Sequence, residues 1–247
     1  MIYYTGDPHG SKQEITRFCN RLRLTSEDTV VVLGDVGTNY YGDSRDNELK
    51  RAFRRLKPTI FCIHGNHEMR PATIPSYKTK EWCGGQIWYE EEYPNLLFAR
   101  DGDIFTIEGL KHLVIGGAYS VDKYYRLMRG YNWWPDEQPS DAIKAYVEEQ
   151  VKRNPRIDVV LTHTCPYRYE PVEAFLPMIN QDTVDASTEH WLDKIEAQLD
   201  YAAWMCGHWH INKEIDKLHF LFHDFKSAEQ LFPNRIGGPA GGFPHEQ

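Results

Sequence analysis

The sequence predicts an α/β fold with a layered core, in which helices cover mixed β-sheets. Short runs rich in β-branched residues alternate with longer amphipathic segments in the first part of the chain, and hairpin signals appear later. Alternation favours parallel strands joined by helices, whereas hairpins add antiparallel strands. The 247 residues suffice for one domain of this kind.

Individual elements follow from these patterns. The predicted strands are 1–5, 29–33, 59–63, 104–107, 112–115, 158–162, 202–206 and 217–223, and the predicted helices are 11–22, 47–56, 140–152 and 188–199. Ser11, with Glu14 three residues later, gives the capping-box pattern at the start of the first helix. We expect residues 119–139 to be an insertion at the rim of the site. Residues 233–247, rich in Gly and Pro, predict an irregular tail.

Charge, cysteine usage and the absence of targeting signals disfavour several classes of protein. The net charge of −8 disfavours binding to long nucleic acid, which usually requires a basic excess. It leaves phosphate substrates open, because bound metal ions can supply positive charge locally. The five cysteines form no CxxC pair, which is typical of a reducing cytosol. Because there is neither a signal-peptide pattern nor a long apolar run, we expect a cytoplasmic protein without membrane contact.

Short polar motifs follow five of the predicted strands. In chain order they supply Asp7 and His9, Asp35, Asn66 and His67, His163, and His208 and His210. Each motif alone is weak, since a Gly-Asp turn or a lone histidine is usually structural. Ligands bind at the carboxyl ends of strands in open α/β sheets, so five motifs at five strand ends predict one shared site.

The residue types at this site indicate metal binding. Apart from His67, the set holds two carboxylates, four imidazoles and one amide oxygen. Such mixed oxygen and nitrogen ligands suit Mn²⁺, Fe or Zn²⁺. A pair of metals about 3.5–4 Å apart needs a bridging ligand, and we expect Asp35 to be that bridge. The Asp7-Pro8-His9 spacing lets two side chains of an extended segment point the same way. Glycines beside the ligands permit the close approach of backbone that such a site needs.

The ordered motifs D-x-H, G-D, G-N-H-E, H and G-H-x-H resemble the signature of the calcineurin-like metallophosphoesterase superfamily. They run from Asp7 to His210, so the resemblance covers most of the chain. It implies a four-layer αββα sandwich of two mixed sheets flanked by helices, in a single domain over residues 1–247. It also implies two divalent metal ions. One would be bound by Asp7, His9, Asp35 and His210, and the other by Asp35, Asn66, His163 and His208.

The resemblance further implies metal-dependent hydrolysis of phosphoric esters by a hydroxide bridging the two metals. Asp35 and His67 would be the catalytic residues, with His67 contacting the phosphate or protonating the leaving oxygen. We expect manganese, with iron or zinc as alternatives. Monoesters and diesters both stay open as substrates. The alternatives are an inactive scaffold of the same fold and a nuclease, which the acidic charge disfavours.

One subfamily, the serine/threonine protein phosphatases, carries G-D-x-x-D-R-G at the second motif. Here Thr38 and Asn39 replace the Asp and Arg. The carboxylate that would pair with His67 and one phosphate-binding arginine are therefore absent from this motif. The T-H-x-x-P form around His163 is similar to the broader superfamily. The substrate is expected to be a small phosphoester or a phosphoprotein.

Several arginines are candidates for contacting the substrate. Residues 119–134 interleave four Tyr and two Trp with cations, including Arg126 and Arg129. Such a segment could stack a base and hold a phosphate, or could be a packed surface hairpin or an oligomer contact. Arg70 and Arg168 follow the third and fourth motifs closely and are further candidates.

Overall fold

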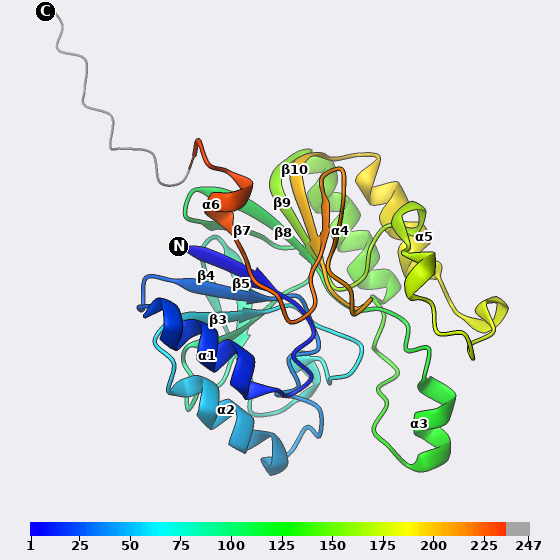
Figure 1. The fold of residues 1–247 in the computed structure, drawn as a ribbon, viewed down its shortest axis with the longest axis horizontal. Helices are drawn as coiled ribbons and strands as arrows, with labels where there is room; N and C mark the ends of the chain where they lie inside the picture. Colours follow the sequence, from blue (N-terminus) through cyan, green and yellow to red (C-terminus); the bar gives the residue numbers. More distant parts are fainter. Residues whose placement is uncertain (236–247) are drawn as a thin grey trace, which may run out of the picture.

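The computed structural model describes residues 1–235, which form two β-sheets covered by helices (Figure 1). The strands are β1 (Ile2–Thr5), β2 (Thr29–Val32), β3 (Thr59–Cys62), β4 (Lys78–Trp82), β5 (Gly85–Tyr89), β6 (Leu96–Ala99), β7 (Ile104–Ile107), β8 (Leu110–Ile115), β9 (Arg156–Thr162), β10 (Asp200–Cys206), β11 (Lys213–Ile215), β12 (Leu218–Phe220) and β13 (Lys226–Ser227). The helices are α1 (Lys12–Leu22), α2 (Asn47–Arg54), α3 (Lys123–Arg129), α4 (Asp141–Arg153), α5 (Ser187–Glu196) and α6 (Ala228–Leu231).

Both sheets are mixed, as the sequence predicted. The first has seven strands in the order β13-β1-β2-β3-β6-β5-β4, and the second has six in the order β11-β12-β10-β9-β8-β7. Strands β1, β2, β3 and β6 are parallel, and so are β8, β9, β10 and β12. The remaining pairs are antiparallel. Each sheet therefore has a parallel centre whose strands end at one edge.

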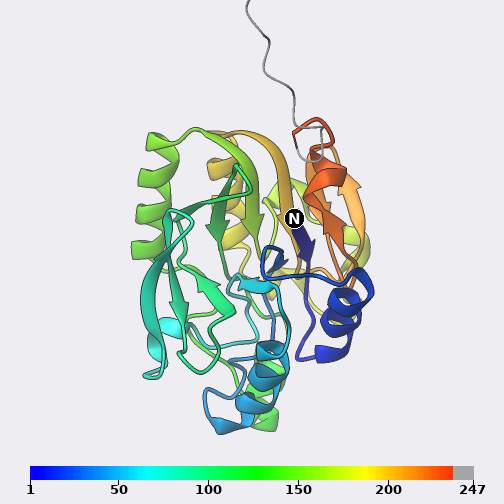
Figure 2. The same cartoon turned by 90° about the vertical axis from the view of Figure 1, so that its left-hand side faces the viewer.

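The layers are held together by three apolar clusters. Side chains such as Phe61 of the first sheet and Phe105 and Leu161 of the second fill the space between the sheets. A second cluster packs α1 and α2 on the outer face of the first sheet, and a third packs α4 and α5 on the outer face of the second. Figure 2 shows α4 at the upper left of the molecule, α1 at the lower right and α2 at the bottom. The predicted αββα sandwich is thereby confirmed.

Differences from the predicted elements have local causes. Strands β4, β5, β6, β11 and β13 and helices α3 and α6 were not predicted, and shared elements differ at their ends by up to three residues. The β4 strand is polar and mostly exposed at the sheet edge, so its sequence carries no apolar alternation. The prediction of a capping box at Ser11 is wrong: Ser11 makes no capping hydrogen bond, and Glu14 contacts His223 instead.

Two further expectations are limited by what the structure describes. Residues 236–247 of the predicted tail lie outside the described residues, and 233–235 form a turn. Within residues 1–235, every helix is too short or too polar to cross a membrane.

A buried hydrogen bond joins the two sheets. The Tyr4 hydroxyl of β1 donates to Nε2 of His112 on β8 at 2.8 Å, and Nδ1–H of His112 donates to the Leu110 carbonyl at 2.9 Å. Burial lowers the pKa of His112 to about 4, so the ring is neutral near pH 7 and Nε2 can accept. Every polar atom of this imidazole is thus satisfied within the core.

Tyr4→Phe should therefore destabilise the fold by about 1–3 kcal/mol, because it leaves a buried imidazole nitrogen without a donor. Urea denaturation near pH 7 measures this change. Tyr124→Phe is the matched control, since Tyr124 is exposed. Equal free energies of unfolding for the two variants would show that this hydrogen bond does not stabilise the fold.

Candidate metal centre

Five strand ends from both sheets meet at one place. Residues Asp7 and His9 follow β1, Asp35 follows β2, Asn66 and His67 follow β3, His163 follows β9, and His208 and His210 follow β10. All eight lie together, as their mutual distances show. The centre is thus built across the junction of the two sheets, at the carboxyl ends of their parallel strands.

The inner half of the centre is largely buried, with Asn66 and His163 enclosed and His208 partly exposed. Nε2 of His163 lies 2.8 Å from Oδ1 of Asn66 and 3.6 Å from Oδ2 of Asp35. Nδ1 of His208 lies 3.2 Å from the same Asn66 oxygen. Nδ1 of His163 is 2.7 Å from the Leu33 carbonyl, to which it donates. That bond fixes the tautomer and leaves the Nε2 lone pair facing the centre, as in histidines that bind metals.

The outer half is partly open to solvent. Nε2 of His9 lies 2.8 Å from Nε2 of His210 and 3.8 Å from Oδ2 of Asp35. Asp7, His9 and His210 can bring one ligand atom each within 4.8 Å of one another, and so can Asp7, Asp35 and His163. Asp35 therefore faces both halves, which suits the bridging position predicted for it.

The charges of this donor set fit divalent cations. Asp7 and Asp35 are buried, and within residues 1–235 their ion-pair partners are all histidines. Oδ1 of Asp7 has no hydrogen-bond partner among these residues. Burial and the neighbouring Asp35 raise the pKa of Asp7 well above its usual range. Bound cations would supply the missing partner of these carboxylates, which are costly to bury alone.

The backbone at the ligands is left-handed rather than extended. Five predicted ligands have positive φ: Asp7 (51°), His9 (41°), Asp35 (51°), His208 (65°) and His210 (52°). The expectation of an extended Asp7-Pro8-His9 segment is therefore wrong. Non-glycine residues seldom adopt this conformation, and such strain is characteristic of functional sites.

Two glycines make room for the carboxylates. A Cβ at Gly65 would lie 2.0 Å from Oδ1 of Asp35, and a Cβ at Gly207 would lie 2.5 Å from Oδ2 of Asp7. The backbone N–H of His67 donates to Oδ1 of Asp35, and that of His208 donates to Oδ2 of Asp7. Glycine is thus needed where the backbone wraps each carboxylate.

The 119–139 segment contributes residues that sequence reasoning missed. The amide of Asn66 donates to Oγ of Ser120 at 2.8 Å, which turns its oxygen toward His163 and His208. Oδ1 of Asp122 lies 3.9 Å from Nε2 of His67 and makes no hydrogen bond within the described chain. A carboxylate therefore does face His67, although the second motif lacks one. The only sequence signal was that this segment follows β8 at the same sheet edge.

Asn39, at the position where protein phosphatases have arginine, is a buried structural residue. Its Oδ1 accepts from the Tyr77 hydroxyl at 2.8 Å, and its carbonyl accepts from the N–H of Met69. It thereby ties the loop after β2 to the loop after β3.

The structure does not bring Arg70 or Arg168 to the centre. Arg70 pairs with Asp101, and its Nε donates to the Asp136 carbonyl at 2.8 Å. Arg168 lies 3.2 Å from Asp193 and 3.3 Å from Glu196, both on α5. Acceptors away from the cleft thus hold both guanidinium groups, and neither lines the cleft at the metal centre.

The arginines of α3 do not line the clefts at the metal centre either. Arg126 is 2% exposed, with its guanidinium 5.8 Å from the Tyr40 ring centroid. Arg129 is exposed, 5.5 Å from the Tyr125 ring centroid. Helix α3 turns these side chains onto neighbouring aromatic rings, so neither lines a cleft at the metal centre, although the Tyr40 ring beside Arg126 does.

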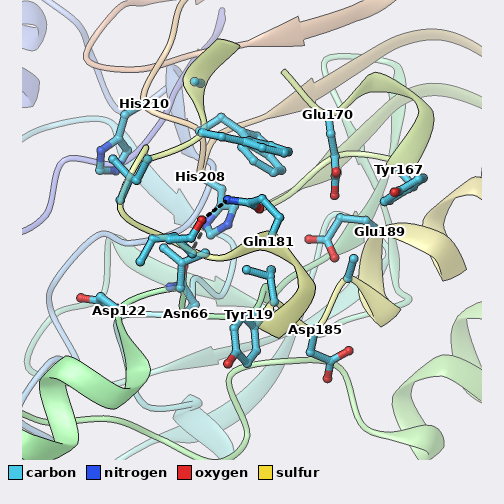
Figure 3. Close-up of a pocket in the computed structure, with 18 of the residues that line it drawn as sticks. Asn66, Tyr119, Asp122, Tyr167, Glu170, Gln181, Asp185, Glu189, His208 and His210 are labelled. Carbon is cyan, nitrogen blue, oxygen red and sulfur yellow. Dashed lines mark hydrogen bonds between the residues drawn. The ribbon is translucent and has the colours of Figure 1, made fainter. Parts of the chain in front are cut away.

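Two clefts open from the centre. Both are lined by His9, Asp35 and His67. The first, about 550 Å³, extends past Trp209 toward α5, and Figure 3 shows its walls. The second, about 480 Å³, is bounded by Lys12 on α1 and by residues of the 40–49 segment. A substrate can therefore reach the centre from either side.

Oxygen and nitrogen donors at the strand ends of a parallel-centred αββα sandwich define a candidate metal-binding protein of the α/β class. A model of the family described as calcineurin-like phosphoesterase matches residues 1–212. The chain belongs to the calcineurin-like phosphoesterase family.

Individual relatives are distant. An uncharacterized protein of Haemophilus influenzae is 27% identical over 139 residues, which are 56% of this chain and 48% of that protein. The chain thus spans about half the length of this curated relative. TT1561 of Thermus thermophilus has a TM-score of 0.51 at 13% identity, over 90% of this chain and 87% of that one. It shares the fold. AQ665 of Aquifex aeolicus, a protein of unknown function, is 16% identical over 69% of this chain and 81% of its own, with a TM-score of 0.26.

Gly207→Ala should weaken metal binding by about tenfold or more, because the added Cβ displaces the Asp7 carboxylate. Titration with Mn²⁺, followed by elemental analysis of the protein, measures the loss. Gly109→Ala, in the turn between β7 and β8, is the control, because its Cβ would meet open space. If both variants retain wild-type metal content, Asp7 is not a ligand.

Proposed function

We propose that the chain hydrolyses phosphoric esters with the help of two divalent metal ions held by the seven donor residues of the centre. The observation that carries the proposal is the convergence of two buried carboxylates, one amide oxygen and four imidazoles beside His67, without a lysine or arginine of residues 1–235 paired to the carboxylates. The family supports this chemistry in general terms.

The ligand assignment follows the two halves of the centre. Asp7, His9 and His210 would hold one ion, and Asn66, His163 and His208 the other, with Asp35 between them. When bound, the ions activate water and neutralise charge on the phosphoryl oxygens. The mixed nitrogen and oxygen set suits manganese, with iron and zinc as alternatives.

His67 is the proposed general acid. Its side chain lines both clefts, so it can reach a phosphate at the centre. Its backbone N–H is tied to Asp35, which fixes the residue beside the ligands. Asp122 would hold the imidazole ring in position. Protonation of the leaving oxygen by His67 is the step this arrangement supports.

The proposed substrate is a small phosphoester. The first cleft, about 550 Å³, matches the volume of small-molecule sites, and a phosphoprotein is the alternative. The net charge of −8 speaks against long nucleic acids. All five cysteines are free, which suits a cytoplasmic location. An inactive scaffold is the second candidate function, but retention of every predicted donor favours the enzyme.

Wild-type protein loaded with Mn²⁺ should hydrolyse p-nitrophenyl phosphate or bis-p-nitrophenyl phosphate. Asp35→Asn should lower kcat/KM by roughly a thousandfold, because it removes the carboxylate that would be shared by the two ions. His67→Ala should lower kcat by about 10²–10⁴-fold through loss of the acid. Initial rates with both esters decide between phosphatase and phosphodiesterase activity. Two bound metals without turnover of either ester would favour the scaffold.

Asp122→Asn should lower kcat by about tenfold with little change in KM, because Asp122 acts through His67. In a His67→Ala background the same substitution should cause no further loss of kcat. Asp141→Asn, at the exposed start of α4, is the control for loss of one acidic charge. Additive losses in the double variant would mean that Asp122 acts independently of His67.

A further inference from the structure

The first cleft has two ends of opposite chemical character. One end is the metal centre, with His208, His210 and Asn66. The other end lies between α5 and the 167–170 segment and carries carboxyl groups. Figure 3 shows Glu170 and Glu189 across the cleft from His208 and Asn66, with Gln181 between them. Among the described residues, no lysine or arginine lines this cleft.

Glu189 is the unusual member of this acidic end. It is only 4% exposed, yet it lines the cleft, and its Oε2 has no hydrogen-bond partner within residues 1–235. Burial raises the pKa of Glu189 to about 7, although the nearby Thr164 hydroxyl acts in the opposite direction. A buried carboxyl oxygen without a donor is costly. The Thr164 hydroxyl is nearby and also has no hydrogen-bond partner within residues 1–235, so it does not satisfy Oε2 in this structure, and a bound ligand would supply a donor.

Glu170 adds a second carboxyl beside the first. It is partly buried, and burial together with Asp193 raises its pKa to about 7. The charge of Glu170 also contributes to the raised pKa of Glu189, so the two carboxyl groups interact electrostatically. A positively charged ligand group would favour ionisation of both, whereas an anionic group would be repelled by both.

Aromatic rings line the path between the two ends. Trp209 stacks on Phe175 with ring centroids 5.7 Å apart, and Tyr167 packs on His190 at 3.8 Å. Tyr119 lines the same cleft. Aromatic faces combined with carboxylates are the recurring environment for organic ammonium groups. Aromatic faces alone would suit many apolar groups. The two carboxylates are the feature that favours a positively charged ligand.

We propose that the substrate's leaving group carries a cationic nitrogen, an ammonium or guanidinium, which Glu189 and Glu170 bind while the phosphate lies at the metal centre. This specificity rests on the proposed phosphoesterase function. In this binding mode, the phosphate and the cationic nitrogen of one small molecule lie at opposite ends of one cleft. Neutral polyols could also donate hydrogen bonds to Glu189, but they would gain nothing from the acidic charge of this end.

Binding of aminoalkyl phosphates of graded chain length tests this proposal, measured by calorimetry on the Mn²⁺-loaded protein. Hydroxyalkyl phosphates of the same lengths are the reference. At the length that spans the cleft, the amine should bind about tenfold more tightly, the value expected of one partly buried ion pair. Glu189→Gln should remove this preference while preserving side-chain shape.

Glu149→Gln, on the exposed face of α4, should leave the preference intact. Because a buried substitution can disturb folding, Glu170→Gln serves as a second variant and should reduce the preference as well. Equal binding of amine and alcohol, failure of both to bind, or a preference that survives Glu189→Gln would overturn the proposal. Turnover of p-nitrophenyl phosphate separately reports on the phosphoesterase function, since it requires no cationic group.

Discussion

Two carboxylates, Asp7 and Asp35, lie buried at the junction of the sheets without a lysine or arginine beside them among the described residues. Much of the surrounding structure serves to hold this arrangement. Left-handed backbone at both residues aims the carboxylates inward, and glycines at 65 and 207 leave room for them. Burying two carboxylates lowers the stability of the protein unless bound cations neutralise them. The strained backbone that holds the carboxylates in place is therefore consistent with the proposed metal chemistry.

The metal centre depends on how two sheets pack rather than on either sheet alone. One sheet supplies the motifs after β1, β2 and β3, and the other supplies those after β9 and β10. The core between the sheets, together with the hydrogen bond from Tyr4 to His112, fixes their relative position. A shift of about 1 Å between the layers would separate His163 from Asn66, so packing and ligand geometry are coupled.

The surroundings of the centre come from connecting segments. The stretch after β8 brings Ser120 to Asn66 and Asp122 to His67, and the stretch after β9 brings Glu170 and Glu189 to the far end of the cleft. The strands thus place the candidate metal donors, while the segments that connect the strands, helix α5 included, line the rest of the cleft. The acidic far end, rather than the arginines near the motifs, distinguishes this cleft from a general anion site.

The sequence by itself determined the sheet class and the identity of the candidate metal donors, because both follow from short patterns: β-branched runs, and polar motifs at the ends of those runs. It could not place arginines 70, 126 and 168, whose guanidinium groups lie against residues brought close by long-range packing. Nor could it reveal that Asp122 faces His67 or that Glu189 lines the cleft. These contacts join residues far apart in the chain, and only tertiary structure decides which distant side chains meet.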